Sequence, residues 1–420
     1  MADGKRVDRR KLLLLTLAGV GTSTAALIGG NEWRERKKRK DAVSFVAADT
    51  AGIVNAGDLV SRRRRLGKTN LDVSVVGIGA GGIEALEPIK RAVDKGMNYV
   101  DTSTCYAGSE DTLGRAFVTY PGLRQKLVIA TKWDPVGSTQ KDEMLASLDQ
   151  SLRRMRTDHV EIMQIHWLGG GHKSPDNGFN RLDNEELYRA MEDAKKAGKV
   201  RFFGATSHDG NRSAILQHAI DKGFDMILVK MNVLDNETAG IPALLAKAKE
   251  RDVGVVVMKS QPGGGRIPHG FEGSKYSIFQ ANLRWVLSHP EVACVVHSSI
   301  GTDASAQDLA ASAVQAPLSV NDRDAELLEE YAEALSPEYC RECAGGCVDA
   351  CPAGVAIPQV MHLTMYERDY GWRRYARELY REMPAGHPTD ACLSCNKCTA
   401  ACPWGVDAAS AMRDAPKRLG

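Results

Sequence analysis

The sequence lacks an excess of charge of either sign. It carries 55 lysines and arginines against 53 aspartates and glutamates, which gives a formal net charge of +2. Without a strong positive excess there is no whole-protein attraction for nucleic acid, so we expect no nucleic-acid partner. Residues 1–48 hold eleven basic and five acidic residues, a surplus of +6, so the remainder sums to −4. The body of the protein is mildly acidic, and only its first segment is basic.

Cysteine is nearly absent from the first 339 residues, where only Cys105 and Cys294 occur. Both are most simply small buried hydrophobic side chains. The other eight cysteines form two tightly spaced runs: Cys340, Cys343, Cys347 and Cys351, then Cys392, Cys395, Cys398 and Cys402. Spacings of two or three residues suit metal ligation, because side chains on one loop can reach the same ion or cluster.

Each cysteine run ends in Cys-Pro, at Pro352 and at Pro403. The second run has the bacterial ferredoxin pattern, and the first differs from it by one inserted residue. We therefore favour two [4Fe–4S] clusters, with the fourth cysteine of each run ligating the other cluster. Two Cys₄ zinc sites and four disulfides are the alternatives, the latter if export came first. The segment resembles a helical two-cluster ferredoxin domain, in which helical residues from about Gln359 to Met383 bring the runs together.

Short apolar runs alternate with helical patterns through the middle of the chain. We expect eight strands, at Val75–Gly79, Asn98–Asp101, Leu127–Thr131, Val160–Ile165, Val200–Ala205, Asp225–Val229, Val253–Met258 and Val292–Val296. The third intervening helix shows the clearest apolar face, formed by Met144, Leu145, Leu148, Leu152 and Met155. Eight units of about thirty residues predict an α/β fold, a (β/α)₈ barrel with function at the C-terminal mouth. A hairpin at Arg62 to Asp72 precedes the barrel, and a helix at Asn321 to Leu335 closes it.

Four ionisable residues stand at or just beyond the ends of three neighbouring predicted strands. Asp101, Lys132 and His166 end the second, third and fourth strands, and Tyr106 lies in the loop after Asp101. A phenol has a pKa of about 10, which a nearby ammonium lowers, so we expect Lys132 to lower the pKa of Tyr106. Asp101 would hold Lys132, His166 would hydrogen-bond a polarised carbonyl oxygen, and Tyr106 would transfer the proton.

From about Leu66 to about Val314 the sequence resembles the aldo-keto reductase family. The motifs that carry the resemblance are Asp101-Thr102-Ser103, Gly108-Ser109-Glu110-Asp111-Thr112-Leu113-Gly114, Ala130-Thr131-Lys132 and Gln164-Ile165-His166-Trp167. The family's Asp, Tyr, Lys and His tetrad matches Asp101, Tyr106, Lys132 and His166 in order. The resemblance implies an oxidoreductase that interconverts a small-molecule carbonyl and an alcohol. The alternative is an electron-transfer or non-catalytic protein whose barrel binds a ligand without turnover.

The resemblance also implies that a nicotinamide cofactor, NAD(P)H, lies across the mouth, held by the loops after strands five, seven and eight. The residues here are Ser207, His208, Lys259, Gly263, Gly264, Ser298, Ser299 and Gly301. The last loop has no lysine or arginine, and Asp303 would repel a 2′-phosphate, so this loop gives no support for a preference for NADPH. We find no flavin motif that would split a hydride pair into single electrons for the clusters, and any redox partner is unidentified.

The N-terminus combines a basic head with an apolar stretch that extends to Gly30. The adjacent Arg9 and Arg10 resemble a twin-arginine export signal, which carries folded proteins, although Asp8 replaces the usual Ser or Thr. We therefore expect contact with the export machinery and a periplasmic or extracytoplasmic membrane-associated location. The alternative is a cytoplasmic enzyme with an accidental apolar N-terminus. The predicted division is a signal or anchor at 1–48, a linker at 49–61, the barrel at 62–335 and the iron–sulfur domain at 336–420.

Overall fold

The computed structural model describes residues 57–106, 108–134, 139–169, 178–234, 240–315, 317–343, 346–383 and 389–420. The predicted signal at 1–48 and most of the predicted linker lie outside these ranges. Within them, no helix combines the length and the apolarity needed to cross a membrane.

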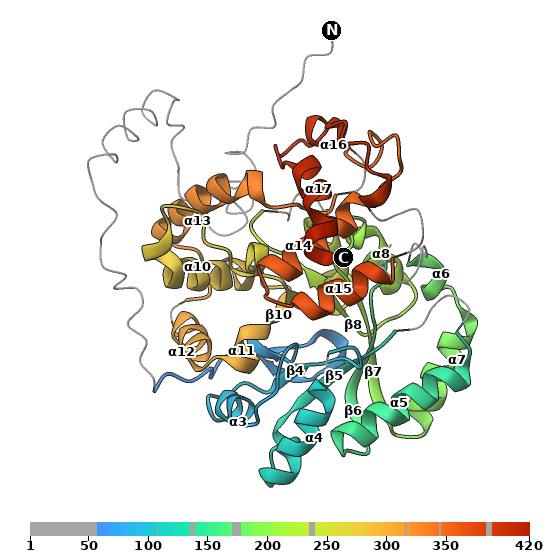
Figure 1. Cartoon of the computed structure of the whole chain (residues 1–420). Coiled ribbons are helices and arrows are strands. Elements are labelled where there is room, and N and C mark those ends of the chain that lie inside the picture. The colour runs from blue at the N-terminus through green and yellow to red at the C-terminus, as the bar shows by residue number, and fades with distance from the viewer. Residues whose placement is uncertain are drawn as a thin grey trace.

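Eight parallel strands close into a barrel in chain order (Figure 1). They are β3 Val76–Gly79, β4 Tyr99–Asp101, β5 Val128–Trp133, β6 Val160–Ile165, β7 Val200–Ser207, β8 Met226–Lys230, β9 Gly254–Met258 and β10 Val292–His297. The ring closes where β10 pairs with β3, with Val295 opposite Val76. All eight predicted strands are confirmed, with ends that differ by one or two residues.

Helices surround the barrel and bury apolar side chains against it. They are α3 Glu87–Asp94, α4 Ser109–Thr119, α5 Lys141–Met155, α6 Phe179–Leu182, α7 Glu185–Lys196, α8 Arg212–Asp221, α9 Ile241–Glu250, α10 Lys275–Leu287, α11 Ser298–Thr302, α12 Ala304–Ala313 and α13 Asp322–Leu335. In α5 the predicted face is buried at Met144, Leu148 and Met155. The helix begins where the Glu143 carboxylate accepts the backbone N–H of Gln140 at 3.0 Å, one half of a capping box.

The predicted hairpin covers the end of the barrel opposite the mouth. It consists of β1 Arg63–Arg65 paired antiparallel with β2 Asp72–Ser74. Leu66 and Val73 are fully buried and belong to the same apolar cluster as the barrel residues Tyr99 and Leu228. Arg64 ties the hairpin to the barrel, since its guanidinium donates to the Leu287 carbonyl at 2.8 Å. The hairpin therefore closes the end of the barrel opposite the mouth.

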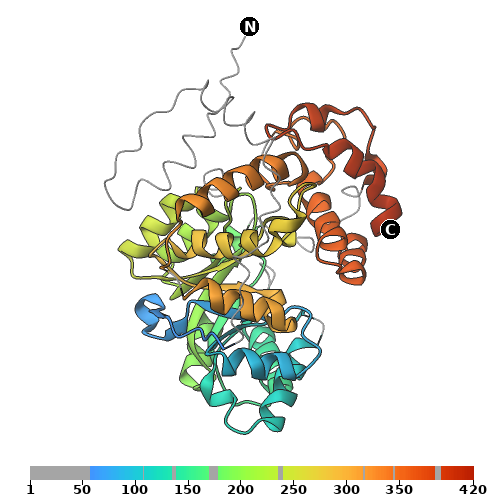
Figure 2. The same cartoon turned by 90° about the vertical axis from the view of Figure 1, so that its left-hand side faces the viewer.

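The C-terminal residues form a small helical module that packs on the carboxyl end of the barrel (Figures 1 and 2). Its helices are α14 Ile357–Arg368, α15 Arg373–Arg381, α16 Lys397–Ala400 and α17 Ala408–Leu419. The helix α14 packs against both α15 and α17, and its Val360 and Leu363 are fully buried. Arg341 fastens the module, because its Nε donates to the Leu234 carbonyl at 2.9 Å while its guanidinium lies 3.9 Å from the ring centroid of Trp404.

Candidate active site and cysteine cluster

Asp101 and Lys132 form a buried ion pair at the mouth, because β4 and β5 are parallel neighbours. Lys132 Nζ donates to Asp101 Oδ2 at 2.6 Å and to the Thr102 carbonyl at 2.7 Å. The exposed fraction of the side chain is 0% for Lys132 and 6% for Asp101. The second oxygen of Asp101 accepts from Gln164 Nε2 at 2.8 Å, a role the sequence analysis did not assign. These contacts hold the ammonium in one place.

Tyr106 lies beside this pair, in the loop after β4. Lys132 Nζ is 4.7 Å from the centroid of the Tyr106 ring, and the ring meets His166 edge-on with centroids 6.0 Å apart. Burial, reinforced by the charges of Asp101 and Cys105, raises the pKa of Tyr106 well above its usual value. The expected lowering of this pKa by Lys132 is therefore wrong. The ammonium is already neutralised by Asp101, and burial decides the direction.

His166 provides a neutral imidazole in the same site. Burial, followed by the charge of Lys132, lowers the pKa of His166 well below its usual value. Its Nδ1 lies 3.4 Å from Ser103 Oγ and 3.7 Å from Cys105 Sγ. An uncharged imidazole can donate one N–H to an oxygen without bringing a second positive charge beside Lys132.

Three of the residues expected to bind the cofactor lie at the mouth, and each contacts another part of the protein. Ser207, at the end of β7, is buried and donates to the Leu168 carbonyl at 2.6 Å. His208 stacks on His362 of α14, with centroids 4.7 Å apart and planes 3° from parallel. Lys259 Nζ lies 3.1 Å from the hydroxyl of Tyr366, also on α14. The module thus touches two residues of the expected cofactor site.

The loop after β9 contains three successive glycines in the left-handed backbone conformation. Gly263, Gly264 and Gly265 have φ values of 55°, 67° and 86°, in the left-handed region. A Cβ added at Gly264 would come within 2.8 Å of the ring of Tyr370. The Gly265 N–H donates to the Pro262 carbonyl at 3.1 Å, and Gly263 is buried. The donors that this loop offers toward a phosphate are therefore the N–H groups of Gly263 and Gly264 and the ammonium of Lys259. Packing against the module explains Gly264.

The remaining three expected cofactor residues belong to the short helix α11 after β10. Ser299 Oγ lies 2.7 Å from His297 Nδ1, and the Ser299 backbone N–H donates to the same nitrogen. Gly301 packs closely on β3, since a Cβ there would meet the Gly79 carbonyl oxygen at 2.6 Å. Ser298 lies beside Gly81, because a Cβ added at Gly81 would be 3.6 Å from the Ser298 hydroxyl oxygen. Trp372 of the module packs on the same glycine.

The C-terminal fold brings cysteines of the two runs together. Cys351 of the first run lines one small cavity with three cysteines of the second run: Cys392, Cys395 and Cys398. Burial and the neighbouring thiols of Cys343, Cys402 and Cys398 raise the pKa of Cys347 to about 11, so Cys347 of the first run lies near two cysteines of the second. Cys347 lies close enough to Cys340 to contribute to raising the pKa of the Cys340 thiol. All ten cysteines lie within the described residues and form no disulfide there.

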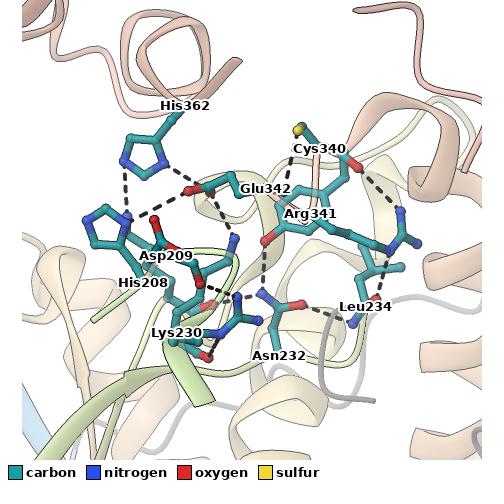
Figure 3. Close-up of polar contacts among 12 residues, drawn as sticks. His208, Asp209, Lys230, Asn232, Leu234, Cys340, Arg341, Glu342 and His362 are labelled. Atoms are coloured by element: carbon teal, nitrogen blue, oxygen red, sulfur yellow. Dashed lines mark hydrogen bonds and ion pairs between the residues drawn. The ribbon is translucent and has the colours of Figure 1, made fainter. Parts of the chain in front are cut away.

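A second buried group of charged side chains lies where the module meets the mouth (Figure 3). Lys230, the last residue of β8, donates to Glu342 Oε1 at 2.9 Å, and His362 Nδ1 lies 3.0 Å from the same oxygen. Burial alone would raise the pKa of Glu342, but His362 and Lys230 hold it well below its usual value. The sequence analysis assigned no role to these three residues. The available signals were a lysine at a strand end and a glutamate inside a cysteine run.

Two family models match this chain. Residues 83–266 match the aldo/keto reductase family, and residues 339–406 match a 4Fe-4S dicluster domain. The uncharacterized oxidoreductase YqkF of Bacillus subtilis (strain 168) is 24% identical over 285 residues, 56% of this chain and 86% of its own length. L-galactose dehydrogenase of Arabidopsis thaliana is 29% identical over 214 residues, 46% of this chain and 63% of its own length.

6-Dehydroglucose reductase of Novosphingobium aromaticivorans is 29% identical over 175 residues, 37% of this chain and 54% of its own length. The chain thus spans most of the Bacillus subtilis protein and less than two thirds of the other two. Among solved structures, an aldo-keto reductase from Bacillus halodurans aligns with a TM-score of 0.50 and 23% identity, over 65% of this chain and 97% of its own. That likeness supports the fold.

Proposed function

We propose that this protein, an oxidoreductase of the aldo/keto reductase type joined to a 4Fe-4S dicluster domain, interconverts a carbonyl and an alcohol with a nicotinamide cofactor. The observation that carries the proposal is the ion pair of Lys132 and Asp101, at 2.6 Å, beside Tyr106 and His166. Four residues with the tetrad's chemistry converge at one mouth, from three consecutive strands and one loop.

The roles of these side chains follow from their protonation. Tyr106 keeps its proton near neutral pH because burial raises its pKa, so it can act as a general acid toward a carbonyl oxygen. His166, neutral, hydrogen-bonds the same oxygen. Lys132, held by Asp101, places positive charge where negative charge develops on that oxygen. The nicotinamide, when bound, supplies or accepts the hydride.

Ser207, His208 and Lys259 would hold the cofactor on one side of the mouth, with the backbone N–H groups of Gly263 and Gly264. Ser298, Ser299 and Gly301 would lie on the other. These residues offer hydroxyl, imidazole, ammonium and backbone donors to an anionic dinucleotide. Binding would require His208 and Lys259 to exchange or share their contacts with α14.

We also propose two [4Fe–4S] clusters. One would be held by Cys340, Cys343, Cys347 and Cys402, and the other by Cys392, Cys395, Cys398 and Cys351. The support is the exchange of the fourth cysteine between the runs, which is typical of two-cluster ferredoxins. The clusters would pass single electrons to a redox partner or support the module.

The test of the enzyme proposal is turnover by anaerobically purified protein. NADPH and NADH oxidation would be followed with aldehydes, ketones and sugar-derived carbonyls, since two similar proteins are a galactose dehydrogenase and a dehydroglucose reductase. Tyr106→Phe should lower kcat by about 10²-fold or more and leave the cofactor Kd unchanged. If the parent protein binds the cofactor but reduces none of the carbonyls, and Tyr106→Phe behaves identically, the alternative of a ligand-binding barrel without turnover holds.

For localisation we propose folded export directed by Arg9 and Arg10, which lie outside the described residues. Clusters assembled before export avoid the competing oxidation of free thiols. Replacing both arginines with lysine should leave a folded, iron-containing protein retained in the cytoplasm. Cell fractionation decides: a parent chain found in the cytoplasm would contradict export.

A further inference from the structure

Glu342 belongs to the first cysteine run and also to the barrel mouth. It follows Cys340 by two residues and precedes Cys343 by one. Its backbone is left-handed, with φ at 56°, and its N–H donates to Cys340 Sγ at 3.4 Å (Figure 3). A non-glycine residue in this region usually persists because its surroundings hold it. Its side chain supplies those contacts.

The Glu342 carboxylate reaches away from the cysteines into a buried polar group. Lys230 Nζ and His362 Nδ1 lie 2.9 Å and 3.0 Å from Oε1, and His208 Nδ1 lies 3.8 Å from Oε2. The exposed fraction of the side chain is 9% for Glu342 and 1% for Lys230. One carboxylate thus joins the ends of β7 and β8 to α14. Arg266 and Glu338 form a second ion pair between the two units, but Glu338 is half-exposed whereas Glu342 and Lys230 are buried.

This geometry resembles a metal site, since one ligand atom each from His208, Glu342 and His362 lie within 4.8 Å of one another. Two ammonium groups argue against a cation there. Lys230 donates to the carboxylate at 2.9 Å, and Lys259 Nζ lies 3.3 Å from His362 Nε2. At these distances each ammonium would repel a bound divalent ion. The charges favour an internal ion pair.

The same group includes two of the residues expected to hold the cofactor. His208 stacks on His362, and Lys259 contacts both His362 and Tyr366. A dinucleotide that engages His208 and Lys259 must therefore alter the surroundings of His362 and Glu342. Since the Glu342 backbone donates to Cys340, any such change reaches a sulfur expected to ligate a cluster.

We propose that Glu342 is a positioning residue shared by the two domains, which sets the reduction potential of the cluster ligated by Cys340 and couples that potential to nicotinamide nucleotide binding at the mouth. The proposal rests on the proposed function, because it needs both a cluster at Cys340 and a nucleotide at the mouth. Hydrogen bonds to the ligating sulfur and nearby net charge are two of the terms that set a cluster's potential.

The direction of the coupling follows from charge. One-electron reduction of the cluster adds one negative charge and no proton, and a bound nicotinamide nucleotide brings the negative charge of its phosphates. The two changes oppose each other, so the reduced protein should bind the nucleotide more weakly. By linkage, the nucleotide must make the cluster harder to reduce by the same factor, and such couplings typically reach about five-fold or more.

The first experiment measures the midpoint potential by anaerobic titration followed by electron paramagnetic resonance. Glu342→Gln should shift it to more positive values and Lys230→Gln to more negative values, because each removes one charge of opposite sign. The matched control is Glu338→Gln. Glu338 precedes Cys340 by two residues, as Glu342 follows it by two, but it pairs with Arg266 at 2.7 Å and is half-exposed.

If either single variant fails to fold, the double variant Lys230→Gln/Glu342→Gln avoids an unpaired buried charge. It should keep a midpoint potential near that of the parent, and a large shift in it would count against the proposal.

The second experiment measures the Kd of NADPH with the clusters oxidised and with the clusters reduced by dithionite. The parent and Glu338→Gln should bind NADPH about five-fold more weakly when reduced, and Glu342→Gln should show a smaller ratio because it loses the carboxylate that joins the two sites. Equal potentials for Glu342→Gln and Glu338→Gln, or equal Kd ratios, would overturn the proposal. The proposal would also be overturned if the parent protein contained zinc or another divalent metal in addition to the cluster iron, and if His208→Ala lost that metal. If the parent binds no NADPH in either state, the proposed function fails, and the potentials alone decide whether Glu342 tunes the cluster.

Discussion

At the scale of single residues, the protonation of Tyr106 and His166 sets the expected pH dependence. Burial raises the pKa of Tyr106 and lowers that of His166, so neither should titrate between about pH 7 and pH 9. We therefore expect kcat for carbonyl reduction to be flat across that window. Lys132→Met should lower kcat by about 10²-fold and leave the profile flat, because Lys132 does not set the Tyr106 pKa.

The check is kcat measured at half-unit intervals in the parent and in Lys132→Met. Removing Lys132 leaves Asp101 buried without its cation. Such a change typically lowers the free energy of unfolding by about 3–5 kcal/mol, and we expect a loss of about that size. The folding of the variant must therefore be verified at each pH. A decline centred near pH 8 in the parent, displaced upward in the variant, would instead show that Lys132 lowers the pKa of the phenol.

His297 gives a stability prediction at the same scale. Burial lowers its pKa from 6.5 to about 4 in the folded protein. Above pH 6.5 the His297 imidazole is neutral in both the folded and the unfolded protein. As the pH falls toward 4, His297 gains a proton only in the unfolded protein, so the free energy of unfolding decreases. By pH 5 this residue should account for a loss of about 2 kcal/mol, at about 1.4 kcal/mol per unit.

Urea unfolding of the parent and of His297→Asn at pH 7 and pH 5 measures this contribution. Asparagine can still accept the N–H of Ser299 but does not titrate, so its stability should fall less between the two pH values. The prediction is wrong if both proteins lose the same amount.

At the scale of elements, the eight strands could be predicted because each is a short apolar run bounded by turn residues. The ends of β4 and β5 then place Asp101 beside Lys132. The contacts of α14 could not be predicted, because a helix buried on several sides has no single apolar face to indicate what it covers. For that reason the contacts of His362 and Tyr366 with the mouth, more than 100 residues away in sequence, had no local signal.

The loop after β9 tests that packing. Gly264→Ala would place a Cβ 2.8 Å from Tyr370, whereas Gly270→Ala, also at positive φ, meets nothing within 4 Å. Both variants bear the backbone strain of alanine at positive φ, roughly 1–2 kcal/mol. Only Gly264→Ala adds a clash with the module, so we expect it to be less stable than Gly270→Ala by about 1–3 kcal/mol. Equal unfolding midpoints in urea would mean that Tyr370 moves away without cost.

At the scale of the whole molecule, the chain joins two units that share one apolar core. A single cluster of buried residues includes the barrel strands and helices and also Val360, Leu363 and Met412 of the module. The described helices α14, α15 and α17 pack on one another, while the first cysteine run precedes α14 and the second lies between α15 and α17. The cysteine spacing indicated the module and its metal chemistry. It could not indicate that the module lies on the mouth, because Lys230 and Glu342 meet only in three dimensions.

Removal of iron should weaken the packing of the module. A metal site formed only in the folded state contributes its binding free energy to folding, so the module should loosen when the clusters are lost. Anaerobic protein should contain about eight irons per chain. After treatment with a chelator and ferricyanide, limited proteolysis should cut within residues 336–420 and leave a resistant fragment that contains residues 62–335.

Because Trp372 and Tyr375 of the module lie against Gly81 and Cys105 at the mouth, the same treatment should change tryptophan fluorescence and open Cys105 to thiol reagents. The rate of Cys105 labelling is the sharper measure, since Cys294 is fully buried in the barrel and serves as an internal control. Mass spectrometry of the labelled peptides would distinguish the two cysteines. Labelling of Cys105 at the same rate before and after iron removal would show that the module covers the mouth without help from its clusters, and that its helices hold their place through apolar packing alone.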